Sequence, residues 1–521
     1  MAQDTREAQR SELFKTIWGI ADEVRGAVDG WDFKSYILCF LFYRFISEDL
    51  AEFIDEGERE AGDASFSYAE LSDGEAEAAR EDVTEEKGFF ILPSQLFQNV
   101  AKAPDKDPEL NVHIKAIFDA VEASSVGTRS EDDFKGLFDD VDVTSNRLGA
   151  DLTERNARLA KIIEGIRDLD FGSVRDARID LFGDAYEYLM NMYASNAGKS
   201  GGEFFTPPEV SELLARIVVG DRASVDKVYD PACGSGSLLL KFAKLLGQEN
   251  VRVGYFGQEI NPTTYNLCRM NMFLHRINFD RFNIARGDTL TNPLHWDDEP
   301  FDAIVSNPPY SVKWVGDEDP TLINDPRFAP AGVLAPKSKA DLAFTMHMLS
   351  WLSSNGKAAI VEFPGVLYRG GAEQKIRKYL VDGNYVEAVI QLPVNLFFGV
   401  TIAVCVIVLS KSKADDRVLF VDASEEFSHV GNKNKLMPEN IERIYRAVHD
   451  RSEEEHFSKL VGIEEIGGEN SYNLSVGTWV EKADTREKID ITELNERIRR
   501  IVAREQELRE QIDAIVAELE A

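Results

Sequence analysis

Apolar residues recur at steps of three and four along the first part of the chain, which is the period of an amphipathic helix. The pattern predicts one helix from about Ser11 and, after a break at Gly30, a second helix that Asp32 can cap. Residues 55–86 are acidic and contain few large apolar side chains, so they are expected to form a mobile or loosely helical insert. Helical patterning then resumes, which predicts a helical N-terminal domain over residues 1–170.

Beyond residue 200, short apolar runs rich in β-branched residues alternate with helical patterns. This alternation is typical of an α/β fold with a largely parallel sheet. The last two runs are joined by only a short apolar link, which suits an antiparallel pair rather than a crossover. We therefore predict an α/β, Rossmann-like core with a seven-stranded mixed sheet over residues 171–425. The expected strands cover residues 225–229, 251–258, 282–286, 301–305, 358–363, 386–392 and 401–410.

Near its C-terminus the chain carries apolar residues in alternating steps of three and four, with charged residues between them. Such heptads predict a coiled-coil helix at the end of a C-terminal region that covers residues 426–521. A helix with an apolar stripe requires a partner, so this helix either folds back on its own chain or pairs with another protein. The stripe consists of Ile491, Leu494, Ile498, Ile501, Leu508, Ile512, Ile515 and Leu519, interrupted by Glu505.

Polar residues follow four successive strands of the predicted sheet, at the point where each strand ends. They are Asp230, Glu259, Asp288 and Asn307. Ligands bind at the carboxyl ends of strands in open α/β sheets, and an acid at the end of the second strand can accept hydrogen bonds from ribose hydroxyls. One such acid could equally cap a helix or a turn. Four polar strand ends in register instead predict one ligand-binding crevice.

The turn after the first of these strands, residues 230–237, reads Asp-Pro-Ala-Cys-Gly-Ser-Gly-Ser and leads into an apolar helix. Small residues between a strand and a helix let a ligand approach the backbone closely. The turn lacks the GxGxxG spacing of a dinucleotide site, and no Gly-Lys-Ser/Thr follows as in a P-loop. It therefore indicates neither of these two classes of site.

Residues 306–310 read Ser-Asn-Pro-Pro-Tyr and directly follow the fourth strand. The prolines fix the backbone and remove two N–H donors, so carbonyl groups and the Asn307 amide remain for a ligand, and Tyr310 offers a flat face for stacking. Asn-Pro is also ordinary turn chemistry. The stretch that follows, residues 311–338, is long for a loop inside a compact domain, and such loops are usually functional. We expect it to be a lid or a substrate-contacting loop.

Composition limits the classes of protein that fit these motifs. The chain has 521 residues, enough for two or three domains, and a formal net charge of −34. A protein that binds nucleic acid alone should carry a basic footprint, so any DNA contact is expected to be local or shared with a more basic partner.

The four cysteines form no CxxC pair, which argues against a disulfide framework and a zinc site. A polar N-terminus and short apolar runs predict a cytoplasmic protein without a membrane segment.

Three motifs together resemble those of S-adenosylmethionine-dependent DNA adenine-N6 methyltransferases. In chain order they are residues 203–207 (Glu-Phe-Phe-Thr-Pro), 230–236 (Asp-Pro-Ala-Cys-Gly-Ser-Gly) and 307–310 (Asn-Pro-Pro-Tyr). With the helical first domain and the terminal heptads, nearly the whole chain closely resembles the modification subunit of type I restriction–modification systems. Asn-Pro-Pro-Tyr is specific for methylation of a planar amide or amine nitrogen, and the Phe-Phe-Thr-Pro element narrows the resemblance to the DNA-modifying branch.

The resemblance implies a catalytic motif made of Asn307, Pro308, Pro309 and Tyr310. Asn307 and the Pro308 carbonyl would hold the target amino group, and Tyr310 would stack on a base that has left the duplex. No metal is expected for methylation.

The resemblance also implies a site for the methyl donor, S-adenosylmethionine. Glu259 would bind its ribose hydroxyls and Asp288 would lie near its adenine, while Phe204, Phe205 and Thr206 would line its methionine end. The other residues implied at this site are Glu203, Pro207, Pro208, Asp230, Gly234, Ser235, Gly236 and Ser237.

Partners follow from the same resemblance. In type I systems a separate specificity subunit reads the DNA sequence, two copies of the modification subunit join it, and a restriction/translocase subunit adds cleavage. The terminal helix would then be a docking element.

An alternative interpretation is a protein-glutamine or ribosomal-RNA nitrogen methyltransferase, because Asn-Pro-Pro-Tyr also serves glutamine side chains. The large helical domain and the heptads disfavour it, and the intact motifs disfavour a non-catalytic structural subunit.

Overall fold

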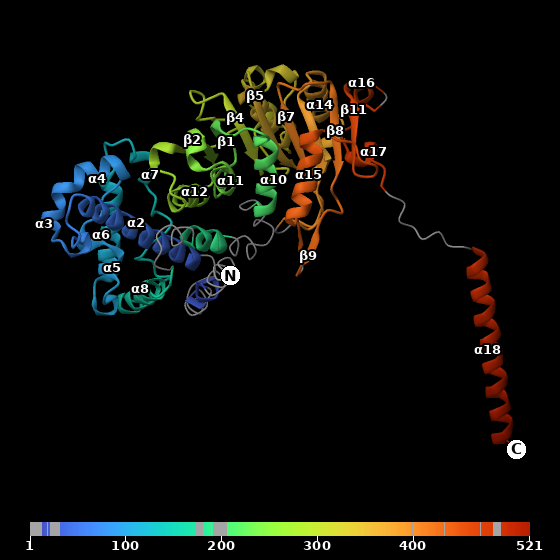
Figure 1. The fold of residues 1–521 in the computed structure, drawn as a ribbon, viewed down its shortest axis with the longest axis horizontal. Helices are drawn as coiled ribbons and strands as arrows, with labels where there is room; N and C mark the ends of the chain where they lie inside the picture. Colours follow the sequence, from blue (N-terminus) through green and yellow to red (C-terminus); the bar gives the residue numbers. More distant parts are fainter. Residues whose placement is uncertain are drawn as a thin grey trace. The chain divides into compact units, whose positions relative to one another are not determined.

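The structure, a computed structural model, describes residues 13–17, 19–20, 32–171, 181–190, 206–397, 400–431, 433–468, 470–482 and 491–520. These residues belong to two compact units, Met1–Val480 and Glu481–Ala521. Figure 1 shows the two units and labels many of their helices and strands. The domain boundaries predicted after residues 170 and 425 both fall within the first unit and stay predictions.

The first part of the larger unit is a group of helices around α2 (Asp32–Glu60). Between Tyr36 and Ile46 nearly every side chain of α2 is buried, so this helix forms the centre of the group. The ring of Tyr43 lies 5.5 Å from Phe97 and 5.6 Å from Phe118, measured between ring centroids. The surrounding helices are α5 (Phe97–Val100), α6 (Leu110–Ser124), α7 (Glu131–Phe134) and α8 (Leu152–Arg167).

The acidic stretch expected as a mobile or loosely helical insert contains the end of α2 and several short helices. Tyr68 anchors it, because this buried side chain donates its hydroxyl to the Ile91 carbonyl at 2.8 Å. Ser72 and Glu75 cap the next helix reciprocally. The low apolar content of the stretch had not indicated that Tyr68, Ala76 and Val83 are buried. The short helices are η1 (Tyr68–Glu70), α3 (Asp73–Ala76), η2 (Glu77–Ala79) and α4 (Arg80–Lys87).

The α/β part contains one nine-stranded mixed sheet in the order β11-β8-β6-β7-β5-β4-β1-β2-β3. The predicted mixed sheet is confirmed, and β7 runs antiparallel to both of its neighbours, β5 and β6. β8 and β11 extend the sheet beyond the seven predicted strands, at the β6 edge. The strands are β1 (Val225–Asp230), β2 (Val251–Glu259), β3 (Phe282–Arg286), β4 (Phe301–Ser306), β5 (Leu352–Glu362), β6 (Val386–Gln391), β7 (Cys405–Ser410), β8 (Arg417–Asp422) and β11 (Ser458–Gly462).

Helices cover both faces of this sheet. Successive residues of a strand point to opposite faces, so the two buried clusters to which they belong identify the helices on each face. On β4, Ala303 and Val305 lie in one buried cluster and Ile304 lies in the other. The first cluster includes side chains of α10 (Pro208–Val219), α11 (Ser237–Leu246) and α12 (Pro262–Leu274). The second includes those of α13 (Asp341–Trp351) and α14 (Ala372–Asp382). The parallel strands β1 to β4 therefore end together at one edge of a three-layered structure.

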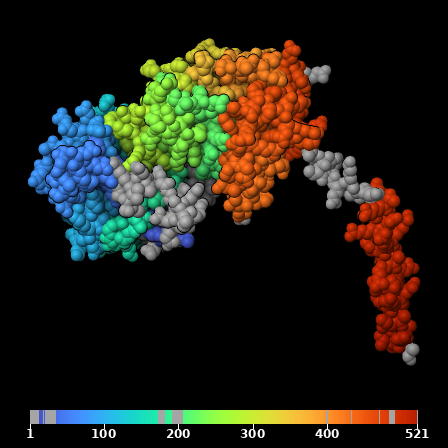
Figure 2. All heavy atoms as spheres, viewed as in Figure 1, coloured from blue at the N-terminus to red at the C-terminus, as the bar shows by residue number. Residues whose placement is uncertain are grey.

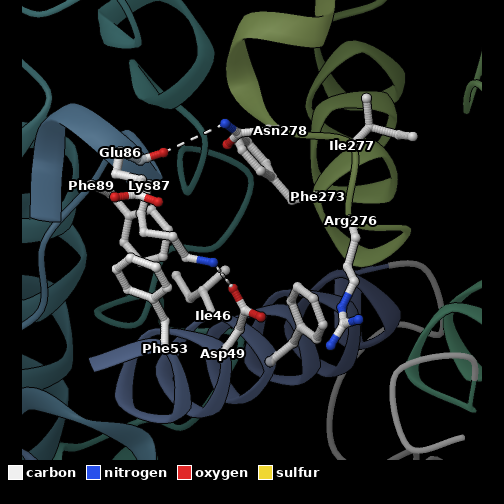
Figure 3. A pocket seen from close by; sticks show the side chains of 11 residues that line it. Ile46, Asp49, Phe53, Glu86, Lys87, Phe89, Phe273, Arg276, Ile277 and Asn278 are labelled. Carbon is white, nitrogen blue, oxygen red and sulfur yellow. Dashed lines mark hydrogen bonds and ion pairs between the residues drawn. The ribbon is translucent and has the colours of Figure 1, made fainter. Parts of the chain in front are cut away.

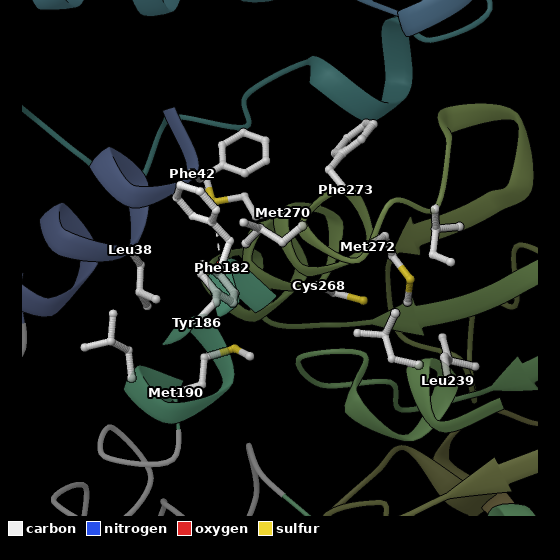
Figure 4. Close-up of a cluster of buried hydrophobic side chains, with 14 of the residues drawn as sticks. Leu38, Phe42, Phe182, Tyr186, Met190, Leu239, Cys268, Met270, Met272 and Phe273 are labelled. Carbon is white, nitrogen blue, oxygen red and sulfur yellow. Dashed lines mark hydrogen bonds between the residues drawn. The ribbon is translucent and has the colours of Figure 1, made fainter. Parts of the chain in front are cut away.

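The N-terminal helices pack directly onto the α/β part, and the two regions adjoin in the space-filling view (Figure 2). The close-up of the core shows the contact at α12 (Figure 4). The Phe273 ring of α12 lies 6.2 Å from Phe42 of α2 and 4.9 Å from Phe134 of α7. Arg269, buried on the same helix, donates from Nη1 to three backbone carbonyls within residues 132–135. The helical and α/β parts of the larger unit therefore share one continuous core.

A hollow of about 340 Å³ lies at this junction, between α2, the end of α4 and the end of α12 (Figure 3). Lys87 Nζ pairs there with an Asp49 carboxylate oxygen at 2.5 Å, and the same ammonium group lies 5.0 Å from the centre of the Phe53 ring. None of the predicted site residues lines this hollow.

The smaller unit contains α18 (Ile491–Glu520), a helix of 30 residues, at the position of the predicted heptads. The apolar residues of the predicted stripe are exposed along the helix, from Ile491 at 71% to Leu519 at 81%. Charged residues between them pair within the helix, as Arg500 does with Glu496. Across all the residues that the structure describes, no helix combines the length and apolar character needed to cross a membrane.

Candidate functional site

The carboxylate of Asp230 lies at the end of β1 and links this strand to β4. Its Oδ1 accepts hydrogen bonds from the Ser306 hydroxyl at 2.8 Å and from the Ala232 N–H at 3.0 Å. Its Oδ2 is buried and has no hydrogen-bond partner among the described residues. Burial, with a contribution from nearby Glu259, raises the pKa of Asp230 to about 7. A buried acceptor without a partner in the protein can be satisfied by a group of a bound ligand or by water.

Glu259 at the end of β2 holds the glycine turn that follows β1. Its two oxygens accept hydrogen bonds from the N–H groups of Gly234 at 3.0 Å and Asn261 at 2.8 Å. Each carboxylate oxygen keeps a second acceptor position. Gly236 has a φ of 78°, and a Cβ added there would lie 2.8 Å from Cys268 Sγ. Glycine is therefore required at position 236 of this turn, and the backbone of the turn lies beside Glu259.

A cavity of about 300 Å³ opens between the ends of β1 to β3 and the chain that follows β4. It brings together Glu259, Asp288 and Pro309, all predicted from the sequence. Sequence reasoning missed most other side chains of the lining, because they come from loops and a helix that carry no recognisable motif. These are Ile260, Asn261, Thr289, Leu290, Val312, Lys313, Trp314 and Phe344. The length of the loop after Tyr310 was the one signal that pointed to Trp314.

The Asn307 amide is fixed between two hydroxyl groups. Its Nδ2 donates to Thr206 Oγ1 at 3.1 Å, and its Oδ1 accepts from the Tyr310 hydroxyl at 2.7 Å. Burial raises the pKa of Tyr310 well above its ordinary value, so the hydroxyl remains a donor. Asn307 itself is buried, with 9% of its surface exposed. Thr206, which the resemblance assigned to the cofactor site, therefore contacts the predicted catalytic amide in this structure.

The other predicted residues lie at the starts of helices or just after strands. Pro207 immediately precedes α10 and Pro208 is its first residue, while Ser237 is the first residue of α11. The Ser235 carbonyl accepts a hydrogen bond from the Asn271 side chain at 2.9 Å. Pro308 is buried between Asn307 and Pro309. Three predicted residues lie outside the described part of the chain: Glu203, Phe204 and Phe205.

Known families match almost the whole chain. Residues 13–166 match the HsdM N-terminal domain, and residues 177–488 match the N-6 DNA Methylase family. The type I restriction enzyme MpnII methylase subunit of Mycoplasma pneumoniae is 49% identical over 531 residues, covering 99% of this chain and 97% of that protein. The chain belongs to the methylase subunits of type I restriction enzymes.

Two further comparisons agree with this family. A crystal structure of the type I restriction-modification system methyltransferase subunit from Streptococcus thermophilus has a TM-score of 0.82 and 35% identity, covering 91% of this chain and 100% of that chain. The MjaVII methylase subunit of Methanocaldococcus jannaschii is 29% identical and covers 98% of this chain and 85% of that protein. The predicted family, fold class and enzyme class are confirmed: the methylase subunit is an adenine-specific DNA methyltransferase with a helical N-terminal domain.

Two further buried acids of the methylase subunit adjoin the Asn-Pro-Pro-Tyr turn, and no sequence motif indicated either of them. Asp341 accepts the backbone N–H of Ser311 at 3.0 Å, and Ser311 has a left-handed φ of 53°. Glu362, the last residue of β5, accepts the Thr345 hydroxyl at 2.9 Å. Burial first, and then nearby Asp341, raises the pKa of Glu362 well above its ordinary value. Asp341 therefore holds the strained residue at which the chain leaves the motif.

The stretch expected as a lid or a substrate-contacting loop is closed at its base in the methylase subunit. The Ala340 N–H donates to the Val312 carbonyl at 2.9 Å, and the Trp314 N–H donates to the Lys337 carbonyl at 3.0 Å. Between them lie only three short helical turns, η8 (Gly316–Glu318), η9 (Leu322–Asn324) and η10 (Ala329–Ala331). The loop has a fixed base, and its role in covering or contacting a substrate stays a prediction.

Proposed function

We propose that this methylase subunit transfers a methyl group from S-adenosylmethionine to the N6 amino group of an adenine that has left a DNA duplex. One observation carries the proposal: Pro309 lines the cavity at the ends of β1 to β3, and Asn307 holds its amide two residues earlier in the same turn. A methyl donor in the cavity and an amino group at Asn307 would meet across this turn. The match to the N-6 DNA Methylase family supports adenine as the base.

The residues around the cavity suit S-adenosylmethionine. The volume of about 300 Å³ lies within the range of small-ligand sites. Glu259 keeps acceptor positions for ribose hydroxyls, and Asp288 shares the cavity wall with apolar Trp314 and Phe344, where we place the adenine. The buried Asp230 Oδ2 supports a donor or cationic group near β1. When bound, S-adenosylmethionine supplies a methyl group activated by the positive charge of its sulfur.

The Asn307 amide and the Pro308 carbonyl are proposed to accept the two hydrogens of the target amino group. An exocyclic adenine amine is a poor nucleophile because its lone pair is delocalised into the ring. Acceptors on both hydrogens favour a pyramidal nitrogen whose lone pair is available for alkylation. Tyr310 occupies only one of the two acceptor positions of Asn307 Oδ1, so the second remains for the substrate. Thr206 holds the other end of the amide.

Tyr310 is proposed to stack on the extruded base. A base must leave the duplex to reach this site, which costs a few kcal/mol of stacking and pairing. Stacking on an aromatic side chain contributes about 1–3 kcal/mol per base. The two contributions are comparable, so stacking on the half-buried Tyr310 ring would offset much of the cost.

A labelled-methyl assay on the assembled complex tests this function. Duplex DNA, RNA and a glutamine-containing protein substrate are offered separately with S-adenosylmethionine labelled in its methyl group. We expect label in N6-methyladenine of the DNA. Label in RNA or protein alone would favour the alternative, a ribosomal-RNA or protein-glutamine nitrogen methyltransferase.

We also propose that two copies of this subunit join one specificity subunit and that a restriction/translocase subunit completes the assembly. The net charge of −34 supports a partner that supplies most of the DNA contact. Relatives are named as subunits of type I restriction enzymes. The mass of the co-expressed complex measures the stoichiometry directly, and one copy per specificity subunit would contradict the proposed ratio.

Binding of S-adenosylmethionine is expected to strengthen several-fold as the pH rises from about 6 to about 8. Asp230 has a pKa of about 7, so it is mostly neutral at the lower pH and mostly ionised at the higher. The ionised carboxylate attracts the cationic donor, whereas the neutral acid does not. Titration calorimetry across this range measures the change. Asp230→Asn should bind more weakly and lose most of the pH dependence, and an unchanged profile in this variant would contradict the assignment.

A further inference from the structure

Arg327 lies in the middle of the loop that follows the Asn-Pro-Pro-Tyr turn, yet only 1% of its surface is exposed. Its Nε and Nη2 donate to the Asp325 carboxylate at 3.0 Å and 2.7 Å. The guanidinium also lies 5.5 Å from the centre of the Trp296 ring and 4.7 Å from that of Phe328. A buried guanidinium must have its charge and its donors satisfied, so its surroundings specify one position for it.

The remaining donors of Arg327 reach the wall of the proposed cofactor cavity. Nη1 donates to the Thr289 carbonyl and Nη2 to the Leu290 carbonyl, each at 2.8 Å. Both residues line the cavity. The Leu290 N–H in turn donates to Asp288 Oδ1 at 3.0 Å. Arg327 therefore holds the backbone from which Asp288 projects, although it does not itself line the cavity.

The same contacts join this wall to the turn after β1 and to the loop. The Thr289 hydroxyl donates to the Pro231 carbonyl at 2.6 Å, next to Asp230. At the start of the loop, Trp314 lines the cavity and packs edge-on against Phe328, the neighbour of Arg327, at 5.6 Å between ring centroids. One side chain thus fixes two walls of the cavity relative to each other: the Asp288 turn and the loop segment that carries Trp314.

We propose that Arg327 is a positioning residue for S-adenosylmethionine, which holds the Asp288 turn and the Trp314 segment at the spacing that the cofactor requires. The inference rests on the proposed function, because it places the cofactor in this cavity. Among the described residues, no hydrogen bond joins Arg327 to Asn307 or Tyr310; the Asn307 amide is held instead by the hydroxyls of Thr206 and Tyr310. Loss of the guanidinium should therefore weaken cofactor binding more than it slows transfer from bound cofactor.

The decisive comparison is Arg327→Met against Arg377→Met in the full chain. Arg377 is a matched control because it too is buried and donates to two backbone carbonyls, those of Tyr472 and Val366, each at 2.8 Å. Neither carbonyl belongs to a residue that lines the cavity. Titration calorimetry with S-adenosylmethionine and thermal melting are measured for both variants. We expect a Kd about tenfold or more above wild type for Arg327→Met, and a change below about twofold for Arg377→Met at a similar loss of melting temperature.

Kinetics of the assembled complex separate positioning from general damage. Arg327→Met should raise the KM for S-adenosylmethionine and leave kcat at saturating cofactor within about threefold of wild type. Arg327→Lys keeps the charge but not the planar guanidinium with its paired donors, so its KM should lie between those of wild type and Arg327→Met. Asp325→Asn, which removes only the ion pair, provides a milder variant if Arg327→Met does not fold, and its KM should rise in the same direction. An unchanged KM in the folded Arg327 and Asp325 variants would overturn the proposal.

The outcome for wild type distinguishes this inference from the proposed function. If wild type does not bind S-adenosylmethionine, the proposed function fails. If wild type binds it, and Arg327→Met and Arg377→Met weaken binding equally at equal melting temperatures, only the positioning role of Arg327 is excluded.

Discussion

Replacing Asn307 with alanine is expected to lower the rate of methyl transfer to DNA by about 100- to 1,000-fold, while S-adenosylmethionine still binds. The Asn307 amide lies between the hydroxyls of Thr206 and Tyr310, so its oxygen has a fixed position when the substrate arrives. The variant removes one of the two acceptors proposed to hold the amino group. It leaves the cavity lined by Glu259 and Asp288 unchanged.

The measurement is single-turnover transfer of a labelled methyl group by the assembled complex, with cofactor affinity measured separately. Asn283→Ala provides the control, because Asn283 is exposed on β3 and does not line the cavity. Asn307→Asp keeps an acceptor oxygen at the same place and should lose less activity than Asn307→Ala. A rate equal to wild type for Asn307→Ala would show that this amide takes no part in catalysis.

Placing aspartate at two positions of the α18 stripe is expected to weaken assembly with the specificity subunit by about 100-fold or more. Ile501 and Ile512 are 61% and 58% exposed in the isolated chain, and an apolar stripe of this length is typical of a helix that pairs with another. Pairing would bury the new carboxylates without a partner, at a cost of several kcal/mol. The double variant Ile501→Asp, Ile512→Asp should therefore fail to co-purify with the specificity subunit.

The control places the same charges on the opposite side of the helix, in Ala503→Asp, Ala517→Asp. Both residues lie at the heptad position farthest from the stripe, so this variant should assemble normally. A chain that ends at Val480, the last residue of the larger unit, should also fail to assemble but should bind S-adenosylmethionine. Normal assembly of the stripe variant, or loss of cofactor binding in the folded shorter chain, would contradict the role of α18 as a docking helix.

The strands that position the site could be predicted because they are short, largely apolar runs with β-branched residues, such as Phe301–Ser306 with Ile304 and Val305. β11 (Ser458–Gly462) was missed because it is an edge strand and holds only two large apolar residues. β8 has a run of four apolar residues, 418–421, as clear as those of the predicted strands. The residues at strand ends were predictable for the same reason as the strands: each ends or closely follows a recognisable run, as Asp230 ends β1.

The side chains that complete the site could not be predicted, because tertiary structure alone brings them there. Phe344 reaches the cavity from the interior of α13, and nothing in its local pattern separates it from a core residue. Asp341 reads as the start of a helix, and Glu362 as the end of a strand. Arg327 lies in a stretch without regular pattern, where a charged residue is expected to face solvent. Its burial follows from partners that the fold brings to it: the Asp325 carboxylate and the carbonyls of Thr289 and Leu290, which come from the stretch after β3.

The proton held by Asp230 links the stability of the subunit to the binding of a cationic ligand near this residue. Burial raises the pKa of this carboxyl from 3.8 to about 7, so the folded chain keeps a proton that the unfolded chain has already released. The free energy of unfolding therefore falls as the pH rises between these two values. At neutral pH the subunit without a ligand therefore has a lower free energy of unfolding. A cationic ligand that neutralises the ionised Asp230 carboxylate restores part of this free energy. Occupancy would then protect the subunit against unfolding in the cell as well as prepare it for methyl transfer.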